Sequence, residues 1–310
     1  MLLPGFVLAV ALAVQAPVPP PSPSAYVGSW NVRITDAADT FVSGGIQIEK
    51  NGDALTAGLV WRWGSYAPAT SVEVRDGALR IVRGAEPGKQ DAWDARLEGG
   101  VLKGVVTYPD GKTHHFEGRR APALAPGKAP RWGRPVRLFD GKTLAGWRLR
   151  DPAAKNGWAV VNGELAVVDP KDNADFVSAR TFRDFKLHLE FNVDAKSNSG
   201  VYLRGRYEIQ ILDNPDGRMA LDTHGCGAVY SRMAPSADAA KAAGEWQTLD
   251  VELAGRQVTV RLNGTLIVQG TIAGVTGGAL SPFEDEPGPL MLQGDHGKVR
   301  FRNIMVTPAR

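Results

Sequence analysis

The chain lacks the cysteines that build disulfide frameworks and the runs of basic residues that typify nucleic-acid surfaces. It has one cysteine, Cys226, so no disulfide can form within the chain. Lysine and arginine never occur in a run longer than a pair, and the net charge is only +3 over 310 residues, which gives no support to nucleic-acid binding. With 43% hydrophobic and 22% charged residues, the composition is that of an ordinary globular protein.

Long hydrophobic runs are also scarce, and none is long enough to predict a membrane span. The first 16 residues, MLLPGFVLAVALAVQA, form a short apolar run that ends in small residues and lacks a positive n-region. We interpret residues 1–16 as a signal peptide and residues 17–25 as a proline-rich linker. No cysteine lies at residues 14–20 to carry a lipid anchor, so a periplasmic or secreted protein is expected.

Residues 26–120 consist of short strand-like runs separated by turn dipeptides. Asn51-Gly52, Asp76-Gly77 and Asp110-Gly111 are such dipeptides, and they supply the positive φ angles of tight hairpins. About eight strands with short connections predict a small up-and-down antiparallel β-barrel. The Gly-Ser-Trp at residues 28–30 resembles the start of lipocalin-like barrels.

The aromatic residues of this first region have two interpretations. They are Trp61, Trp63, Tyr66 and Trp93. They could form a carbohydrate-stacking patch, but aromatic side chains of a small barrel are more often core, and this is the interpretation we favour. The role of residues 26–120 stays open at this stage.

Residues 121–134 contain three prolines and no periodic pattern, which indicates a domain boundary. Residues 135–310 then carry more than ten strand-like runs and no sustained helical period, which predicts two packed antiparallel sheets, a jelly roll. The chain is therefore expected to be all-β. In the central stretch 185–214, a period of two predicts one polar face that carries His188, Glu190, Arg204, Glu208 and Gln210.

The second region resembles a known family. Seven motifs in the family's order carry the likeness: LFDGKTLAGW at 138–147, NSGVYLRG at 198–205, YEIQILDN at 207–214, GAVY at 227–230, GEWQTLDVEL at 244–253, LNG at 262–264 and LQGDHGKVRFRNI at 292–304. Together they resemble the 3-keto-disaccharide hydrolase domain family over about residues 135–310. The chain departs from the family at 293–297, where QGDHG is one residue longer than the usual spacing.

The resemblance implies a concanavalin-like jelly roll that holds its sugar on the concave sheet. It also implies a glycoside oxidised at C3 by a partner sugar 3-dehydrogenase. A ketone at C3 acidifies the C2 proton, so the aglycone can leave by β-elimination and water can add back. Such chemistry needs a general base, a donor for the enolate oxygen and an acid for the leaving group.

The predicted polar face offers candidates for each role. Glu208 is the candidate base, Arg204 the candidate oxyanion donor, and His188 or His296 the candidate acid. Arg204 and Glu208 could instead pair as a structural ion pair across neighbouring strands. The expected sugar-binding residues are Glu190, Asn198, Tyr202, Gln210, Tyr230 and Gln293.

Two other functions are compatible with the sequence. A retaining β-glucanase needs two carboxylates about 5 Å apart, and Glu190 with Glu208 is the strand-borne pair available. A carbohydrate-binding protein would present aromatic platforms, for which Tyr202 and Tyr230 are candidates. No cofactor is expected, although Glu284, Asp285 and Glu286 form an acidic cluster that could hold a structural calcium.

Overall fold

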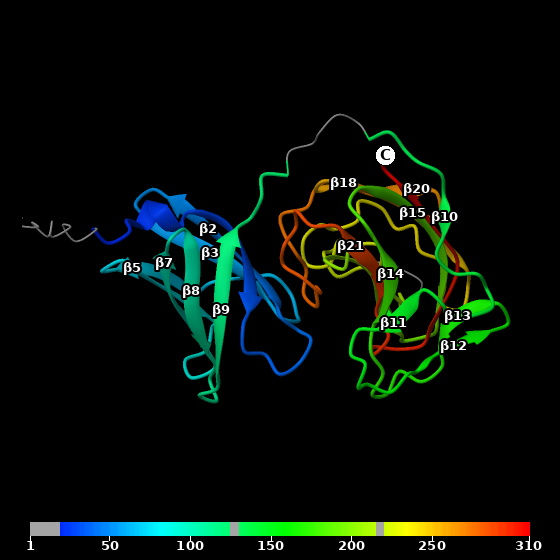
Figure 1. Cartoon of the computed structure of the whole chain (residues 1–310), viewed down its shortest axis with the longest axis horizontal. Coiled ribbons are helices and arrows are strands. Elements are labelled where there is room, and N and C mark those ends of the chain that lie inside the picture. Colours follow the sequence, from blue (N-terminus) through cyan, green and yellow to red (C-terminus); the bar gives the residue numbers. More distant parts are fainter. Residues whose placement is uncertain (1–18, 125–129, 215–219) are drawn as a thin grey trace, which may run out of the picture.

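The computed structural model describes residues 19–124, 130–214 and 220–310. The predicted signal peptide lies outside these residues, as do parts of both predicted linkers, so those assignments stay predictions. Apart from one short 3-10 helix, η1 (Pro23–Tyr26), the regular structure of the described residues is β-strand, arranged in three sheets. The prediction of an all-β chain is confirmed (Figure 1).

The first sheet is antiparallel, and its nine strands pair only with one another. They are β1 (Gly28–Ile34), β2 (Ser43–Asn51), β3 (Ala54–Trp61), β4 (Ala67–Pro68), β5 (Ser71–Arg75), β6 (Ala78–Arg83), β7 (Asp91–Glu98), β8 (Val101–Thr107) and β9 (Thr113–Arg120). Their order is β4-β3-β2-β1-β9-β8-β7-β6-β5. The turn dipeptides act as expected, since Gly52, Asp76 and Gly77 have φ values of 61°, 49° and 66°.

The sheet curls into a closed barrel because one stretch of chain serves both of its edges. Ala69 N–H donates to Ala57 O (2.8 Å) beside β3, and the next residue, Thr70, donates to Val82 O (2.7 Å) beside β6. The kinked pair β4–β5 therefore acts as one strand that completes an up-and-down barrel. Trp30, Trp61 and Trp93 fill its core, as the favoured interpretation of the barrel aromatics expects for Trp61 and Trp93.

The remaining strands form two sheets packed face to face. The larger sheet contains β10 (Val136–Arg137), β12 (Trp158–Val161), β13 (Glu164–Val167), β15 (Phe185–Val193), β18 (Gln247–Ala254), β19 (Gln257–Leu262), β20 (Thr265–Thr271) and β22 (Val299–Pro308). The five-stranded sheet contains β11 (Trp147–Leu149), β14 (Phe176–Phe182), β16 (Asn198–Leu203), β17 (Tyr207–Leu212) and β21 (Gly288–Leu292), in the order β11-β14-β21-β16-β17. This is the predicted jelly-roll sandwich.

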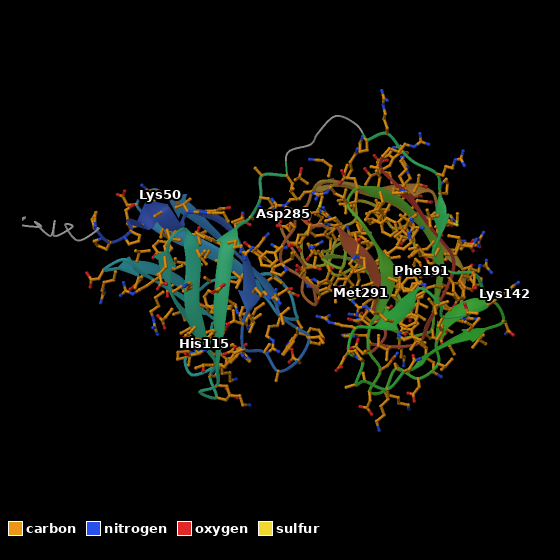
Figure 2. All side chains as sticks on the ribbon, viewed as in Figure 1. Lys50, His115, Lys142, Phe191, Asp285 and Met291 are labelled. Carbon is orange, nitrogen blue, oxygen red and sulfur yellow. The ribbon has the colours of Figure 1, made fainter. Side chains whose placement is uncertain are left out.

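Alternating side chains of both sheets build the sandwich core. Leu187, Leu189 and Phe191 of β15 point inward and meet Val201 of β16 and Ile209 of β17 in one buried cluster. Figure 2 places Phe191 between the sheets, surrounded by side chains. The intervening residues of each strand, which include Glu208, must then face outward, away from the other sheet.

The barrel lies beside the sandwich (Figure 1). The two touch through buried contacts. Val60 of the barrel packs against Val275 and Ala279 of the sandwich. The Arg150 side chain, only 5% exposed, donates from Nε and Nη2 to the hydroxyl and carbonyl of Thr40 at 3.1 and 3.0 Å. Within the described residues no helix is long and apolar enough to cross a membrane.

Candidate functional site

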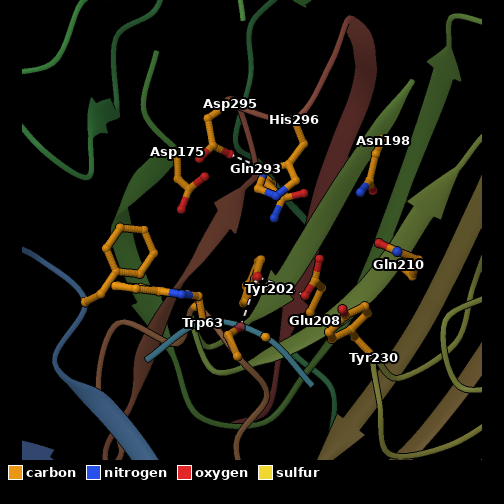
Figure 3. A pocket seen from close by; sticks show the side chains of 14 residues that line it. Trp63, Asp175, Asn198, Tyr202, Glu208, Gln210, Tyr230, Gln293, Asp295 and His296 are labelled. Atoms are coloured by element: carbon orange, nitrogen blue, oxygen red, sulfur yellow. Dashed lines mark hydrogen bonds and ion pairs between the residues drawn. The ribbon is translucent and has the colours of Figure 1, made fainter. Parts of the chain in front are cut away.

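The outer face of the five-stranded sheet carries a pocket of about 580 Å³ (Figure 3). This volume falls in the range of small-molecule sites, about 300–1,000 Å³. Most of its lining comes from the sandwich, and the barrel contributes Phe41, Trp63 and Gly64. The sandwich residues that line it are Asp175, Asn198, Tyr202, Glu208, Gln210, Tyr230, Gly277, Gly278, Gln293, Asp295 and His296.

Glu208 lies at the centre of the pocket floor. It stands opposite Tyr202 in the register of β16 and β17, while Gly200 stands opposite Gln210. A Cβ on Gly200 would lie 2.3 Å from Oε1 of Glu208. The glycine therefore leaves the space in which the carboxyl group lies across the sheet.

Burial changes the charge state of Glu208. Removal from water raises the pKa of its carboxyl group to about 8, although the hydrogen bond from Tyr202 favours the ionised form. The Tyr202 hydroxyl lies 2.9 Å from Oε2 of Glu208 and 3.1 Å from the carbonyl oxygen of Gly277. It can donate to the carboxylate, or accept from the neutral acid while donating to Gly277, so both forms of Glu208 have a partner.

His296 and Asp295 form an ion pair at the pocket wall, on the loop between β21 and β22. Nδ1 of His296 lies 2.5 Å from Oδ1 of Asp295, and this hydrogen bond raises the pKa of the histidine against the effect of burial. Burial acts to raise the pKa of Asp295, but the histidine outweighs it and the pKa falls. His296 is thus biased toward its charged form and able to donate a proton.

Asp175 holds this loop in place from below. Its Oδ1 accepts from Gly294 N–H at 3.3 Å, and its Oδ2 lies 3.2 Å from Nη1 of Arg150. Burial raises the pKa of Asp175 in spite of the arginine. Asp175 and Asp295 were not among the residues selected from the sequence, because each lies in a loop whose path the strand pattern does not define.

Three amide side chains on one side of the pocket have unused hydrogen-bonding capacity. They are Asn198, Gln210 and Gln293, and the side-chain oxygen of each is buried without a partner in the described part of the chain. Buried polar groups in proteins are nearly always paired with protein, water or ligand. These amides can therefore bind hydroxyl groups of a ligand, as expected from the sequence for all three.

Aromatic side chains also line the pocket. Tyr202 and Tyr230, both expected from the sequence, line it together with Trp63, and Tyr202 lies beside Glu208. Trp63 is 58% exposed, so the favoured interpretation of the barrel aromatics as core does not describe it. Amide groups together with aromatic rings suit a sugar, which has both hydroxyls and apolar C–H faces.

His188 and Glu190 do not reach this pocket, contrary to the prediction of one polar face. Both lie on β15, which belongs to the larger sheet, and the chain crosses to the other sheet before β16 begins. His188 pairs with Asp250 at 2.7 Å, and Glu190 pairs with Arg302 at 2.6 Å. The outward faces of the two sheets point in opposite directions, so Glu190 and Glu208 cannot flank one glycosidic bond as a glucanase would require.

Arg204 also lies away from the pocket lining and does not pair with Glu208. Its backbone has a φ of 53° in the turn after β16, and its side chain is buried under that turn. Nη2 donates to the Tyr207 hydroxyl at 3.1 Å and to Gly255 O at 2.7 Å. The predicted oxyanion role and the alternative ion pair with Glu208 are both wrong for this arrangement.

The acidic cluster at 284–286 does not form a calcium site. Glu284 is fully buried, where it binds Arg256 and accepts from the Tyr207 hydroxyl at 2.7 Å. Glu286 lies 3.7 Å from Nη2 of Arg206. Nowhere in residues 19–124, 130–214 and 220–310 do three or more potential ligands gather as a metal centre.

Comparison with known families gives a match for the sandwich. Residues 134–307, more than half of the chain, match the family described as 3-keto-alpha-glucoside-1,2-lyase-like domains. The matched segment contains the sandwich residues of the pocket and excludes Phe41 and Trp63. The barrel is thus an addition to the part of the chain that defines the family.

The individual proteins to which the chain is similar share only a small part of its sequence. The 3-keto-disaccharide hydrolase of Bacteroides thetaiotaomicron is 24% identical over 51% of this chain, which spans 64% of the relative's length, less than two thirds. A candidate glycosyl hydrolase of Parabacteroides distasonis with a solved structure is 28% identical, with 56% of this chain and 83% of that chain covered and a TM-score of 0.48. The β-glucanase of Bacillus licheniformis is 13% identical, with 57% and 99% covered and a TM-score of 0.36. Both scores are too low to transfer an activity.

Proposed function

This chain belongs to the family of 3-keto-alpha-glucoside-1,2-lyase-like domains, and from that premise we propose that its pocket cleaves glycosides whose sugar is oxidised at C3. The observation that carries the proposal is Glu208, a buried carboxyl group with a pKa of about 8 on the floor of the pocket. Carboxyl groups with strongly raised pKa values in clefts are typical of general acid–base sites. A protein that only binds sugars has no need of such a group.

The reaction begins with loss of the C2 proton to Glu208. The electrons of the C2–H bond form the enolate, with its negative charge on the C3 oxygen. When the C3 carbonyl re-forms, the C1=C2 double bond is made, the bond from C1 to the leaving oxygen breaks, and that oxygen takes a proton. Water then adds across C1=C2, with OH at C1 and H at C2, and gives the 3-keto sugar. The net reaction is hydrolysis.

Glu208 suits the first step because the pKa of its carboxyl group, about 8, lies close to neutral pH. A base is most effective when its pKa lies near the working pH. At pH 7 most Glu208 is protonated in the empty pocket, and the ionised fraction, about one tenth, is the reactive form. Tyr202 donates to that form and lies in place beforehand.

His296 suits the protonation of the leaving oxygen. Asp295 stabilises its charged form, and the ring lines the same pocket as Glu208. The amide groups of Asn198, Gln210 and Gln293 would hold the sugar hydroxyls and donate to the enolate oxygen. In this mechanism the three amide groups, and not Arg204, donate hydrogen bonds to the enolate oxygen.

We also infer which reaction supplies the substrate and where the cleavage takes place. Only an oxidation at C3 of the sugar can supply a 3-keto-glycoside, so a sugar 3-dehydrogenase must act before this protein. With the apolar run at residues 1–16 as a signal peptide, cleavage takes place in the periplasm or outside the cell.

Product analysis tests the proposal. The protein is incubated with a 3-keto-glucoside and, separately, with the same glucoside before oxidation, and the released aglycone is measured. We expect release from the keto substrate alone. Release from the unoxidised glucoside would instead indicate a conventional glycosidase, and binding of either compound without release would indicate a carbohydrate-binding protein.

A further inference from the structure

We propose that the N-terminal barrel completes the substrate site, with Trp63 and Phe41 forming a stacking platform for the leaving group of the glycoside. This inference rests on the proposed function, because it assigns the two ends of the same pocket. The platform lies outside the segment that matches the family. It would bind a ring, either a second pyranose or an aromatic aglycone, through its flat apolar face.

Trp63 differs from the other tryptophans of the barrel. Its side chain is 58% exposed, whereas Trp30, Trp61 and Trp93 are at most 4% exposed. An indole that could be buried in a barrel core but instead lines a pocket exposes apolar surface to water at a cost in free energy. A ligand ring that covers this surface would recover it.

Trp63 is held firmly by its neighbours in the barrel. The edge of the Phe41 ring meets it at 87° with 5.4 Å between centroids, and the Arg62 guanidinium lies 4.4 Å from the indole centroid. Arg62 and Gly64 on either side have φ values of 45° and 94°, so the chain turns sharply around the tryptophan. The ring is therefore presented in a fixed position.

Contacts with the sandwich fix the Trp63 loop, residues 62–66, above the pocket. Gly278 N–H donates to Arg62 O at 2.6 Å, before the tryptophan. After it, Ser65 Oγ lies 2.8 Å from Nε2 of His224, and Tyr66 N–H donates to Ser231 Oγ at 2.9 Å. One anchor before Trp63 and two after it tie the tryptophan to loops of the sandwich.

Arg150 couples Phe41 to the same pocket. Its guanidinium carbon lies 3.8 Å from the Phe41 centroid, and its Nη1 donates to Gly278 O at 2.6 Å and lies 3.2 Å from Asp175. A single buried cation thus contacts the platform and the pocket wall. Arg150 therefore holds the Phe41 ring at a fixed distance from Gly278 and Asp175 in the pocket wall.

The distribution of polar groups assigns the two ends of the pocket. Figure 3 shows Trp63 on one side of Glu208, with Asn198 and Gln210 on the other. The unpartnered amide oxygens can bind the hydroxyl-rich keto sugar, whereas Trp63 and Phe41 offer aromatic rings. The bond to be broken would then lie over Glu208, with the leaving ring on the platform.

Substrates that differ only in the leaving group test this assignment. The ratio of kcat/KM for phenyl 3-keto-glucoside to that for methyl 3-keto-glucoside is measured for wild type, W63A, W63F and W246A, with a 3-keto-disaccharide as a third substrate. We expect W63A to lower the ring-to-methyl ratio about tenfold, and W63F to restore most of it. W246A removes a tryptophan that stacks on Arg302 of the other sheet and should leave the ratio unchanged. A greater loss with phenyl than with the disaccharide would identify an aromatic leaving group, and the reverse a sugar.

An equal loss for all substrates in W63A, or no loss, would overturn the platform while leaving the proposed function intact. Failure of the proposed function is detected separately, since wild type would then release no methanol from methyl 3-keto-glucoside. In that case E208Q and E208Q/W63A are titrated with phenyl and methyl glucoside. A preference for phenyl that W63A abolishes would support the platform, and equal binding of both would refute it.

Discussion

The hydroxyl group of Tyr202 lies 2.9 Å from Oε2 of Glu208, and the two residues are only 2% and 4% exposed. They stand opposite each other on β16 and β17, so strand pairing alone brings them together. Because both are largely removed from water, the charge state of Glu208 responds to what enters the pocket.

The pH dependence of turnover distinguishes a base from an acid at Glu208. Burial raises its pKa to about 8, so the ionised fraction grows about tenfold per pH unit at lower pH. If Glu208 is the base, kcat/KM rises between pH 5 and pH 7 and declines only when His296 loses its proton. We expect this ascending limb in wild type. A rate that is highest at pH 5 would show that protonated Glu208 acts as the acid.

Glu208 is also expected to destabilise the fold at neutral and alkaline pH. Its pKa is raised from 4.5 to about 8 in the folded state, so its favourable contribution is complete below pH 4.5 and is lost as pH rises through 8. The loss amounts to at most about 5 kcal/mol. E208Q should therefore melt several degrees above wild type at pH 8.5, with a difference that vanishes near pH 4. Melting curves across this range check the claim, which fails if the difference is constant.

Gly200 offers a test of the carboxyl position. In G200A the new Cβ would lie 2.3 Å from Oε1 of Glu208, so the carboxyl group must move. We expect kcat to fall about 100-fold, as displacement of a catalytic group by about 1 Å can cause. G45A is the matched control, because its Cβ would meet its nearest neighbour at an ordinary 3.5 Å. Unchanged kcat in a folded G200A would exclude a positional requirement for Glu208.

His296 and His188 are expected to behave differently on substitution. H296A should lower kcat about 100-fold or more for methyl 3-keto-glucoside, and less for a p-nitrophenyl leaving group that needs no proton. H188A should leave both rates within about twofold of wild type, since His188 pairs with Asp250 on the opposite face of the sandwich. An equal effect of H296A on both leaving groups would remove His296 from the role of acid.

Sequence reasoning predicted local structure well because its signals are local. The hairpin at Asp76-Gly77 forms as expected, with positive φ at both residues and Arg75 paired with Ala78 across the turn. Alternation likewise identified the inward residues of β15, β16 and β17. The outward face of β17, with Glu208 and Gln210, followed from the same alternation.

The sheet to which each strand belongs could not be read from alternation. A period of two separates the faces of one strand, but strand pairing depends on contacts distant in sequence. This is why His188 of β15 was grouped with Glu208 although their sheets face opposite ways. Trp63 was assigned to the barrel core in preference to a carbohydrate-stacking patch for a related reason, since only the docking of the barrel on the sandwich reveals that an exposed tryptophan borders the pocket.

The most direct test of the central claim, that Glu208 removes the C2 proton of a 3-keto-glycoside, is cleavage in D₂O. The product is trapped at once by borohydride reduction and its deuterium content at C2 is determined, with E208Q and protein-free samples as controls for spontaneous exchange. The account predicts one solvent deuterium at C2 for each molecule cleaved by wild type, and cleavage lowered at least about 100-fold in E208Q. Cleavage that retains hydrogen at C2, or that proceeds at the wild-type rate in E208Q, would contradict it.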